Sequence, residues 1–291
     1  MALEFGTTLP CQGPLAHPES LAQLALRAQE LGFESVWAPD HVVLPIAVEG
    51  GTYPYTADGS PPWAEHEELL APLITLAWVA SIAKDVRLGV SILVLPLRNA
   101  LIAAKDIGTL DFLSGGRLVL GVGSGWLREE FDILGLRFDE RFERTEEGIR
   151  LLRACWTTEP VEHHGTFYDL DPFSMIPKPG PVPVWGGGTS ERWLRIVVGV
   201  CDGWHPANLL PDEWALGATR VRELLAESGR DQETLTLTAR PARDVVVDRE
   251  LADAYARAGA VHILAPVEYR AIDSVAEAIT TMEQLAQRLH L

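Results

Sequence analysis

The chain has 291 residues, 47% of them hydrophobic and 22% charged, which is enough to bury one large core or two ordinary ones. Lys and Arg number 24 against 41 Asp and Glu, and the resulting net charge of −17 disfavours nucleic acid and anionic membranes as partners. Three widely spaced cysteines form no CxxC motif and are typical of reduced core residues in a cytoplasmic protein.

No segment has the pattern of a signal peptide or a transmembrane helix. The first residues carry no basic stretch followed by a long apolar run. The most apolar segment, residues 70–97, is interrupted by charged residues and a proline. We therefore expect neither a secretory signal nor a membrane span.

Short apolar runs alternate with helical periodicity along nearly the whole chain. The expected strands are Leu3–Thr8, Ser35–Ala38, Val86–Val94, Leu118–Val122, Val182–Gly186, Asp202–His205, Thr234–Ala239 and Val261–Leu264. The expected helices are Pro18–Leu31, Glu67–Lys84, Asn99–Leu113, Arg141–Trp156, Ser190–Val200, Pro211–Ser228, Glu250–Ala258 and Ser274–Leu289. This α/β alternation predicts one domain over residues 1–291, a (β/α)₈ TIM barrel with insertion loops at the C-terminal face of its strands. Because periodicity does not show closure, an open doubly wound sheet is the alternative.

The second expected strand ends in Asp40 and His41, and a segment rich in Pro, Gly, Tyr and Thr follows up to Glu65. Active sites of barrels lie where strands end at the C-terminal face. A histidine titrates near neutral pH, so His41 is the candidate for proton transfer, with a packing or capping role as the other interpretation. A loop of this length is typical of a lid, and we expect residues from about 42 to 65 to order over a ligand.

The next expected strands also end in polar or glycine-rich segments. The third ends near Pro96 and Arg98, which alone indicate a turn and a surface charge. The fourth ends in residues 121–126, Gly-Val-Gly-Ser-Gly-Trp, whose spacing is not that of the GxGxxG dinucleotide fingerprint. Such close glycines indicate either backbone near a ligand or a tight strand-to-helix turn. Residues 160–181, with alternating aromatic side chains, predict a short hairpin and a connector.

The fifth expected strand runs into three glycines, 186–188, and then into Thr189 and Ser190, where the next helix begins. Glycines allow close approach of a ligand, and the first N–H groups of a helix are unpaired donors with partial positive charge. The pattern predicts a phosphate site, or else a glycine-rich turn with an ordinary N-cap. Glu191 in the first turn disfavours a nearby anion unless its side chain points outward.

Two common kinds of catalytic site have no matching motif in the sequence. No HxH, HExxH or Cys/His cluster has the spacing of metal ligands, so we expect no metal site. No Gly-x-Ser-x-Gly elbow is present, which disfavours a serine hydrolase.

Taken together, these segments resemble the bacterial luciferase-like family, particularly its oxidoreductases that use the deazaflavin coenzyme F420. The resemblance is strongest over residues 1–205, and its order and spacing are more specific than any single motif. The matching segments are residues 34–41, 87–93, 115–126, 129–131, 177–179, 184–191 and 202–204.

The resemblance implies a cofactor ring at the C-terminal mouth of the barrel, with its phosphate near the fifth strand. The implied cofactor-binding residues are Asp40, Ser91, Ile92, Val94, Ser124, Gly125, Glu129, Gly187, Gly188 and Thr189. Relatives that use the deazaflavin often have a non-prolyl cis peptide in the third strand, which would here join Ser91 to Ile92. Relatives are commonly dimers, so we expect a homodimer.

The resemblance also bears on the substrate. Sugar-phosphate dehydrogenases of the family carry a glutamate where this chain has Trp126, which disfavours a sugar phosphate. The expected pocket residues Tyr53, Tyr55, Trp63 and Trp126 favour a small apolar or aromatic substrate instead.

Three functions are consistent with the sequence. The first is hydride transfer between coenzyme F420 and a small organic substrate, with His41 as the proton-transfer group. The second is an FMN-dependent two-component monooxygenase that receives reduced flavin from a partner reductase. The third is a cofactor-binding or sensing protein without turnover. The deazaflavin has a longer anionic tail than FMN, so contacts from Arg98, Lys105 or Arg128 would favour the first.

Overall fold

The computed structural model describes residues 3–46, 63, 67–242 and 245–291, and its strands form a closed parallel barrel. Around the barrel the strand order is β1-β10-β9-β8-β7-β4-β3-β2. The strands are β1 Glu4–Thr8, β2 Ser35–Ala38, β3 Arg87–Val94, β4 Leu118–Gly123, β7 Val184–Gly186, β8 Gly203–Trp204, β9 Thr236–Ala239 and β10 His262–Ala265. The predicted TIM barrel is confirmed, each expected strand is present within a few residues, and the open-sheet alternative is wrong.

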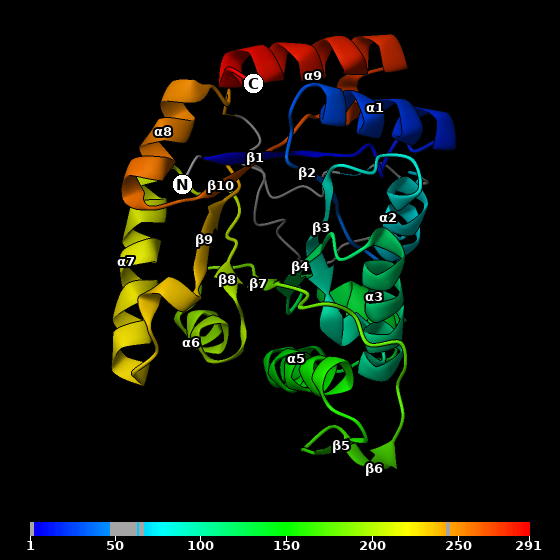
Figure 1. The fold of residues 1–291 in the computed structure, drawn as a ribbon, viewed down its shortest axis with the longest axis vertical. Helices are drawn as coiled ribbons and strands as arrows, with labels where there is room; N and C mark the ends of the chain where they lie inside the picture. The colour runs from blue at the N-terminus through cyan, green and yellow to red at the C-terminus, as the bar shows by residue number, and fades with distance from the viewer. Residues whose placement is uncertain (1–2, 47–62, 64–66, 243–244) are drawn as a thin grey trace.

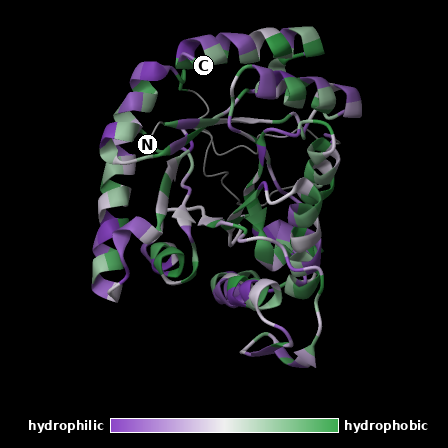
Figure 2. Cartoon of the chain, in the orientation of Figure 1, coloured by the Kyte–Doolittle hydropathy of each residue, from purple (hydrophilic) through white to green (hydrophobic). Residues whose placement is uncertain are grey.

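Helices surround the barrel as an outer ring (Figure 1). They are α1 Pro18–Glu30, α2 Pro72–Ala80, α3 Ala100–Ser114, α4 Arg128–Ile133, α5 Arg141–Thr157, α6 Glu191–Val200, α7 Pro211–Ser228, α8 Arg249–Ala258 and α9 Val275–Leu289. Hydrophilic and hydrophobic residues alternate along α8 and α9, as expected for helices with one face on the barrel and one in water (Figure 2). Within the part of the chain that is described, no helix has the length and apolar character needed to cross a membrane.

Two helices and one insertion differ from or match the expected elements as follows: α2 is shorter, α4 is additional, and the hairpin is present. The helix expected at Glu67–Lys84 is only Pro72–Ala80. It begins at Pro72 because a proline in the first turn lacks only an N–H that would have no partner there, and its C-cap is Ser81. Helix α4 was not expected at all. The predicted hairpin is confirmed: β5 Val161–His164 and β6 Asp169–Phe173 pair antiparallel and project beyond α5 (Figure 1).

The barrel interior holds two stacked indole rings. Trp37 and Trp185 have ring centroids 5.6 Å apart, and both are buried. Glycines on neighbouring strands make room for Trp37: a Cβ on Gly89 would lie 2.1 Å from its ring and a Cβ on Gly6 2.5 Å. Gly203 does the same for Trp185, at 2.5 Å. Part of the glycine content of these strands is therefore explained by packing.

The three cysteines behave as the sequence predicts. Cys11, Cys155 and Cys201 are all free and buried. Burial raises the pKa of Cys11 and of Cys201 to about 12, so these thiols stay protonated and unreactive at neutral pH.

Two buried histidines inside the barrel, His205 and His262, make stability depend on pH. Burial lowers the pKa of both, that of His262 to about 3. In the unfolded chain a histidine takes up a proton near pH 6.5, so below that pH the unfolded state binds more protons than the folded one. The free energy of unfolding should therefore fall as the pH falls from about 7 to about 5, by about 1.4 kcal/mol per pH unit per histidine at most.

Urea unfolding at a series of pH values measures this slope. A folded His262→Gln variant should show a smaller slope, since one of the two buried groups is gone. A free energy of unfolding that stays constant between these pH values would contradict the assignment of both rings as neutral.

Candidate active site at the mouth of the barrel

The end of β2 is tied to the end of β3 by a buried ion pair. Both Asp40 carboxylate oxygens accept hydrogen bonds from Arg98, at 2.5 and 2.7 Å, and one also accepts the Val94 N–H at 2.8 Å. Burial raises the pKa of Asp40, and the Arg98 guanidinium opposes that rise. Asp40 and Val94, both expected at the cofactor, therefore lie together, and Asp40 has a structural partner that the sequence did not indicate.

His41, the next residue, is held by a carboxylate from α4. Its Nδ1 lies 2.9 Å from Oε2 of Glu130, whose side chain is only 2% exposed. The other oxygen of Glu130 accepts the N–H groups of Val42 and Val43, at 2.6 and 3.3 Å. Because the carboxylate offers only acceptors, we assign the proton to His41 Nδ1, which makes Nε2 the nitrogen available to a substrate.

Glu130 is a candidate site residue that the sequence analysis missed. The resemblance directed attention to its neighbour Glu129, which lies half-buried on the same short helix. Two adjacent glutamates can be told apart only once the helix and its inward face are known. The burial of Phe131, 1% exposed, fixes the orientation of α4 and turns Glu130 inward.

Two of the expected substrate-pocket residues surround His41. The ring centroids of His41 and Trp63 are 5.3 Å apart, those of His41 and Trp126 are 6.3 Å apart, and the two indoles are 6.1 Å apart. We call these three residues the aromatic cluster. Tyr53 and Tyr55, together with most of the expected lid, fall outside the described residues.

The third strand has an irregularity at the expected place. The peptide bond between Ser91 and Ile92 is cis, as the resemblance implies, and the register between β3 and β4 shifts between Val90 and Leu93. The Ile92 side chain lies over the ends of β4 and β7: a Cβ on Gly123 or on Gly187 would come within 2.6 or 2.7 Å of it. Packing against Ile92 thus accounts for glycine at these two positions.

The loop from β7 to α6 retains the features of an anion site. Gly188 has φ +106°, a conformation that favours glycine, and Ser190 caps α6 by accepting the Trp193 N–H. Glu191 points away from the loop, since its carboxylate binds Arg195 and Arg220, and Arg220 lowers the pKa of Glu191 to about 2. Because Glu191 points outward, its charge does not disfavour an anion at the loop. The remaining N–H groups of the first turn of α6 and the Thr189 hydroxyl are donors that suit a phosphate.

Ser124 and Gly125 follow β4 at the same end of the barrel and are half-buried. Gly125 has φ +82° and lies against Val94, whose Cγ1 would be 2.7 Å from an added Cβ. The structure therefore gathers the described candidate residues at the C-terminal ends of β2, β3, β4 and β7. Their contacts with a cofactor stay a prediction.

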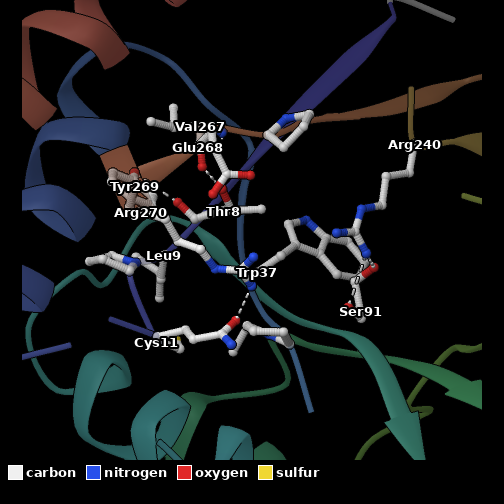
Figure 3. Close-up of a pocket in the computed structure, with 15 residues that line it drawn as sticks. Thr8, Leu9, Cys11, Trp37, Ser91, Arg240, Val267, Glu268, Tyr269 and Arg270 are labelled. Atoms are coloured by element: carbon white, nitrogen blue, oxygen red, sulfur yellow. Dashed lines mark hydrogen bonds between the residues drawn. The ribbon is translucent and has the colours of Figure 1, made fainter. Parts of the chain in front are cut away.

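A pocket opens beside these residues, between the ends of β1, β2 and β10 (Figure 3). Ser91 and Trp37 form its inner side, and Tyr269 is held in its wall by a 3.0 Å hydrogen bond to Thr8 O. The other residues around it include Leu9, Gln12, Arg240, Val267, Glu268 and Arg270. The sequence analysis missed this wall, because the C-terminal third of the chain carries the weakest resemblance.

The three basic residues that would favour the longer cofactor tail all have partners within the protein. Arg98 binds Asp40, and Arg128 forms a 2.9 Å ion pair with Asp139. Lys105 donates to Ile176 O at 2.5 Å. None of the three is therefore reserved for the longer tail, so the expected support for coenzyme F420 over FMN is not found at these residues.

The sequence as a whole matches a known protein family. The luciferase-like monooxygenase family matches the chain over residues 3–289. The chain belongs to this family. It is therefore an oxidoreductase of the luciferase-like class, and the resemblance inferred from the motifs is confirmed.

Individual relatives are more distant. An uncharacterized protein of Mycobacterium tuberculosis is 32% identical over 208 residues, which covers 71% of this chain and 72% of the relative. An F420-dependent glucose-6-phosphate dehydrogenase of Amycolatopsis mediterranei is 37% identical over 176 residues, 58% of this chain and 47% of that enzyme. Among solved structures, an F420-dependent secondary alcohol dehydrogenase superposes with a TM-score of 0.78 at 18% identity, covering 98% of both chains. A long-chain alkane monooxygenase superposes with a TM-score of 0.75 at 13% identity, and at such identities the likeness shows the fold alone.

Proposed function

We propose that this protein transfers a hydride between coenzyme F420 and a small apolar or aromatic substrate, with His41 moving the accompanying proton. The observation that carries the proposal is the fixed geometry of His41, whose Nδ1 binds the buried carboxylate of Glu130 inside the aromatic cluster. Relatives named as F420-dependent enzymes, at 34% and 37% identity over part of the chain, support the choice of cofactor.

The residues present suit the phosphate and the ring of the cofactor. Gly188, Thr189 and the first turn of α6 would hold its phosphate through backbone and hydroxyl donors, and the β3 irregularity at Ser91 and Ile92 would support its ring. When bound, the deazaflavin supplies or accepts a hydride. The protein's task is then to orient the substrate, exclude water and manage one proton.

His41 and Glu130 manage that proton. With Nδ1–H donating to Glu130, Nε2 takes a proton from the substrate in one direction and returns it in the other. Glu130 stabilises the positively charged imidazolium that forms in between, and its own orientation is fixed by the N–H groups of Val42 and Val43. The indoles of Trp63 and Trp126, which pack against each other beside His41, would shield a bound substrate from water.

The role of Glu130 can be tested separately. A Glu130→Gln variant keeps the size of the side chain but loses its charge, so we expect roughly 10²-fold lower turnover at saturation with cofactor. Asp132→Asn, an exposed carboxylate on the same helix, is the matched control and should leave turnover unchanged. Equal turnover of the two variants would show that Glu130 only anchors the loop.

Thr189 provides a milder test of the phosphate loop. It is exposed at the start of α6, and Thr189→Ala should weaken cofactor binding by about 1 kcal/mol if the hydroxyl makes one neutral hydrogen bond. Titration of cofactor fluorescence measures the change. An affinity identical to that of the wild type would leave phosphate binding to the backbone N–H groups alone.

A second candidate function is an FMN-dependent monooxygenase. The partners of Arg98, Lys105 and Arg128 within the protein favour it, because no described basic side chain among these three is reserved for a long anionic tail.

Oxygen dependence separates the two functions. The proposed enzyme should oxidise the reduced deazaflavin in the presence of small carbonyl compounds without oxygen. A requirement for reduced FMN and oxygen would instead establish the monooxygenase.

A further inference from the structure

A buried histidine, His205, lies behind the proposed cofactor site and contacts Ser91 of β3. His205 follows β8 and is 1% exposed. Its ring stacks on Trp37, with centroids 5.1 Å apart and an interplanar angle of 17°. His205 lies 164 positions from His41 in the chain and is not part of the proton-transfer pair, so the mechanism above leaves it without a role.

The hydrogen bonds around His205 fix which ring nitrogen carries the proton. The Thr238 hydroxyl donates its only hydrogen to Trp204 O, at 3.1 Å. The same oxygen lies 2.6 Å from His205 Nδ1 and, with its hydrogen directed to Trp204 O, can only accept there, so we assign the ring proton to Nδ1. The Nε2 atom is then the acceptor, and the hydroxyl of Ser91, 3.0 Å away, donates to it.

The ring is kept in this single state. Burial, with His262 and Arg240 nearby, lowers the pKa of His205 well below its usual range, so the ring stays neutral at the pH of the cell. A protonated ring would place a second N–H against the Ser91 hydroxyl, which then could not donate to it. A neutral ring with its proton on Nδ1 is consistent with the hydrogen bonds from Thr238 to Trp204 O, from His205 to Thr238 and from Ser91 to His205.

Ser91 is held from its other side as well. Arg240 Nη1 lies 3.3 Å from Ser91 O and 3.4 Å from its hydroxyl oxygen, beside the ring of Trp37 (Figure 3). The hydroxyl oxygen accepts from Arg240 while its hydrogen goes to His205. Ser91 is 6% exposed, and it is the first residue of the irregular segment of β3.

We propose that His205 and Thr238 are positioning residues, which fix the Ser91 hydroxyl and thereby the part of β3 that supports the cofactor ring. The inference rests on the proposed function, because it assumes that a flavin-like ring lies on this segment. It assigns a role to a side chain that neither the motifs nor the resemblance singled out. It also explains why a fully buried threonine stands at position 238 of β9, where a valine has the same shape.

Thr238→Val is the sharpest test, since it removes the acceptor of His205 Nδ1–H and keeps the volume. Thr7→Val is the matched control: Thr7 is also a fully buried barrel threonine, and its hydroxyl has no hydrogen-bond partner among the described residues. We expect Thr238→Val to weaken binding of coenzyme F420 by about threefold to tenfold and to shift the absorption band of the bound cofactor. Thr7→Val should change neither.

Nitrogen-15 NMR of labelled histidine gives a second readout that needs no cofactor. In the wild type, the His205 signals, assigned by their absence in His205→Gln, should show the proton on Nδ1, and Thr238→Val should shift the ring toward the other tautomer. A wild-type ring with its proton on Nε2, or a Thr238→Val protein that binds cofactor as Thr7→Val does, would overturn the proposal. Failure of the wild type to bind either F420 or FMN would instead overturn the proposed function, which makes the two failures distinguishable.

Discussion

Replacement of His41 with alanine is expected to lower turnover by about 10²–10⁴-fold, the usual range for loss of a general acid–base group. His41 is oriented by Glu130 and packs against Trp63 and Trp126, so its removal takes away the proton carrier and leaves Glu130 without that partner. The dissociation constant of the cofactor should change little, because the proposed phosphate contacts lie at the start of α6.

Turnover and cofactor dissociation constant measured side by side decide between catalysis and packing. His164→Ala is a suitable control, since His164 lies exposed on the β5–β6 hairpin with Asp169 as its partner. A folded His41→Ala protein with normal saturated turnover would remove His41 from the mechanism. Weaker cofactor binding with intact turnover would assign it a packing role.

Substitution at the glycine loop is expected to abolish cofactor binding. Gly188→Val places a side chain where the phosphate would approach, at a backbone φ of +106° that disfavours any residue except glycine. Its Cβ would also lie 3.0 Å from the Trp193 ring. Gly187→Val should have the same effect on binding, but its Cβ would lie 2.7 Å from Ile92, so this variant also disturbs the barrel.

Gly188→Ala is the milder variant that keeps the test informative if the valine variant does not fold. Gly199→Ala is the control, because Gly199 lies on α6 with open space around an added Cβ. Thermal unfolding shows whether each variant is folded, and fluorescence titration gives its affinity. Unchanged cofactor affinity in folded Gly188 variants would contradict the assignment of this loop to the phosphate.

The barrel could be predicted because each strand is a short apolar run and each helix shows apolar residues at the spacing of a helical turn. Both patterns are local properties of the sequence. The ends of the strands could be compared with a family because their motifs are also local. Helix α4 is six residues long and has no clear periodicity, so the distinction between Glu129 and Glu130 was not accessible. The start of α2 is different, because a proline at the first turn of a helix is a local signal that the sequence analysis did not use.

Contacts between distant segments were not predictable either. Arg98 read as a surface charge, yet it binds Asp40, 58 positions away. Several glycines read as ligand contacts, yet Gly187 also makes room for Ile92 and Gly89 for Trp37. These residues come into contact only when the barrel closes, and the pattern of residues within either segment does not indicate the contact.

The central claim is most directly tested by titrating the purified protein with coenzyme F420 and with FMN and following the fluorescence of each. We predict saturable binding of coenzyme F420, tighter than that of FMN and lost in a folded Gly188→Val variant. Binding of FMN alone, or F420 binding that the glycine variant retains, would contradict the account.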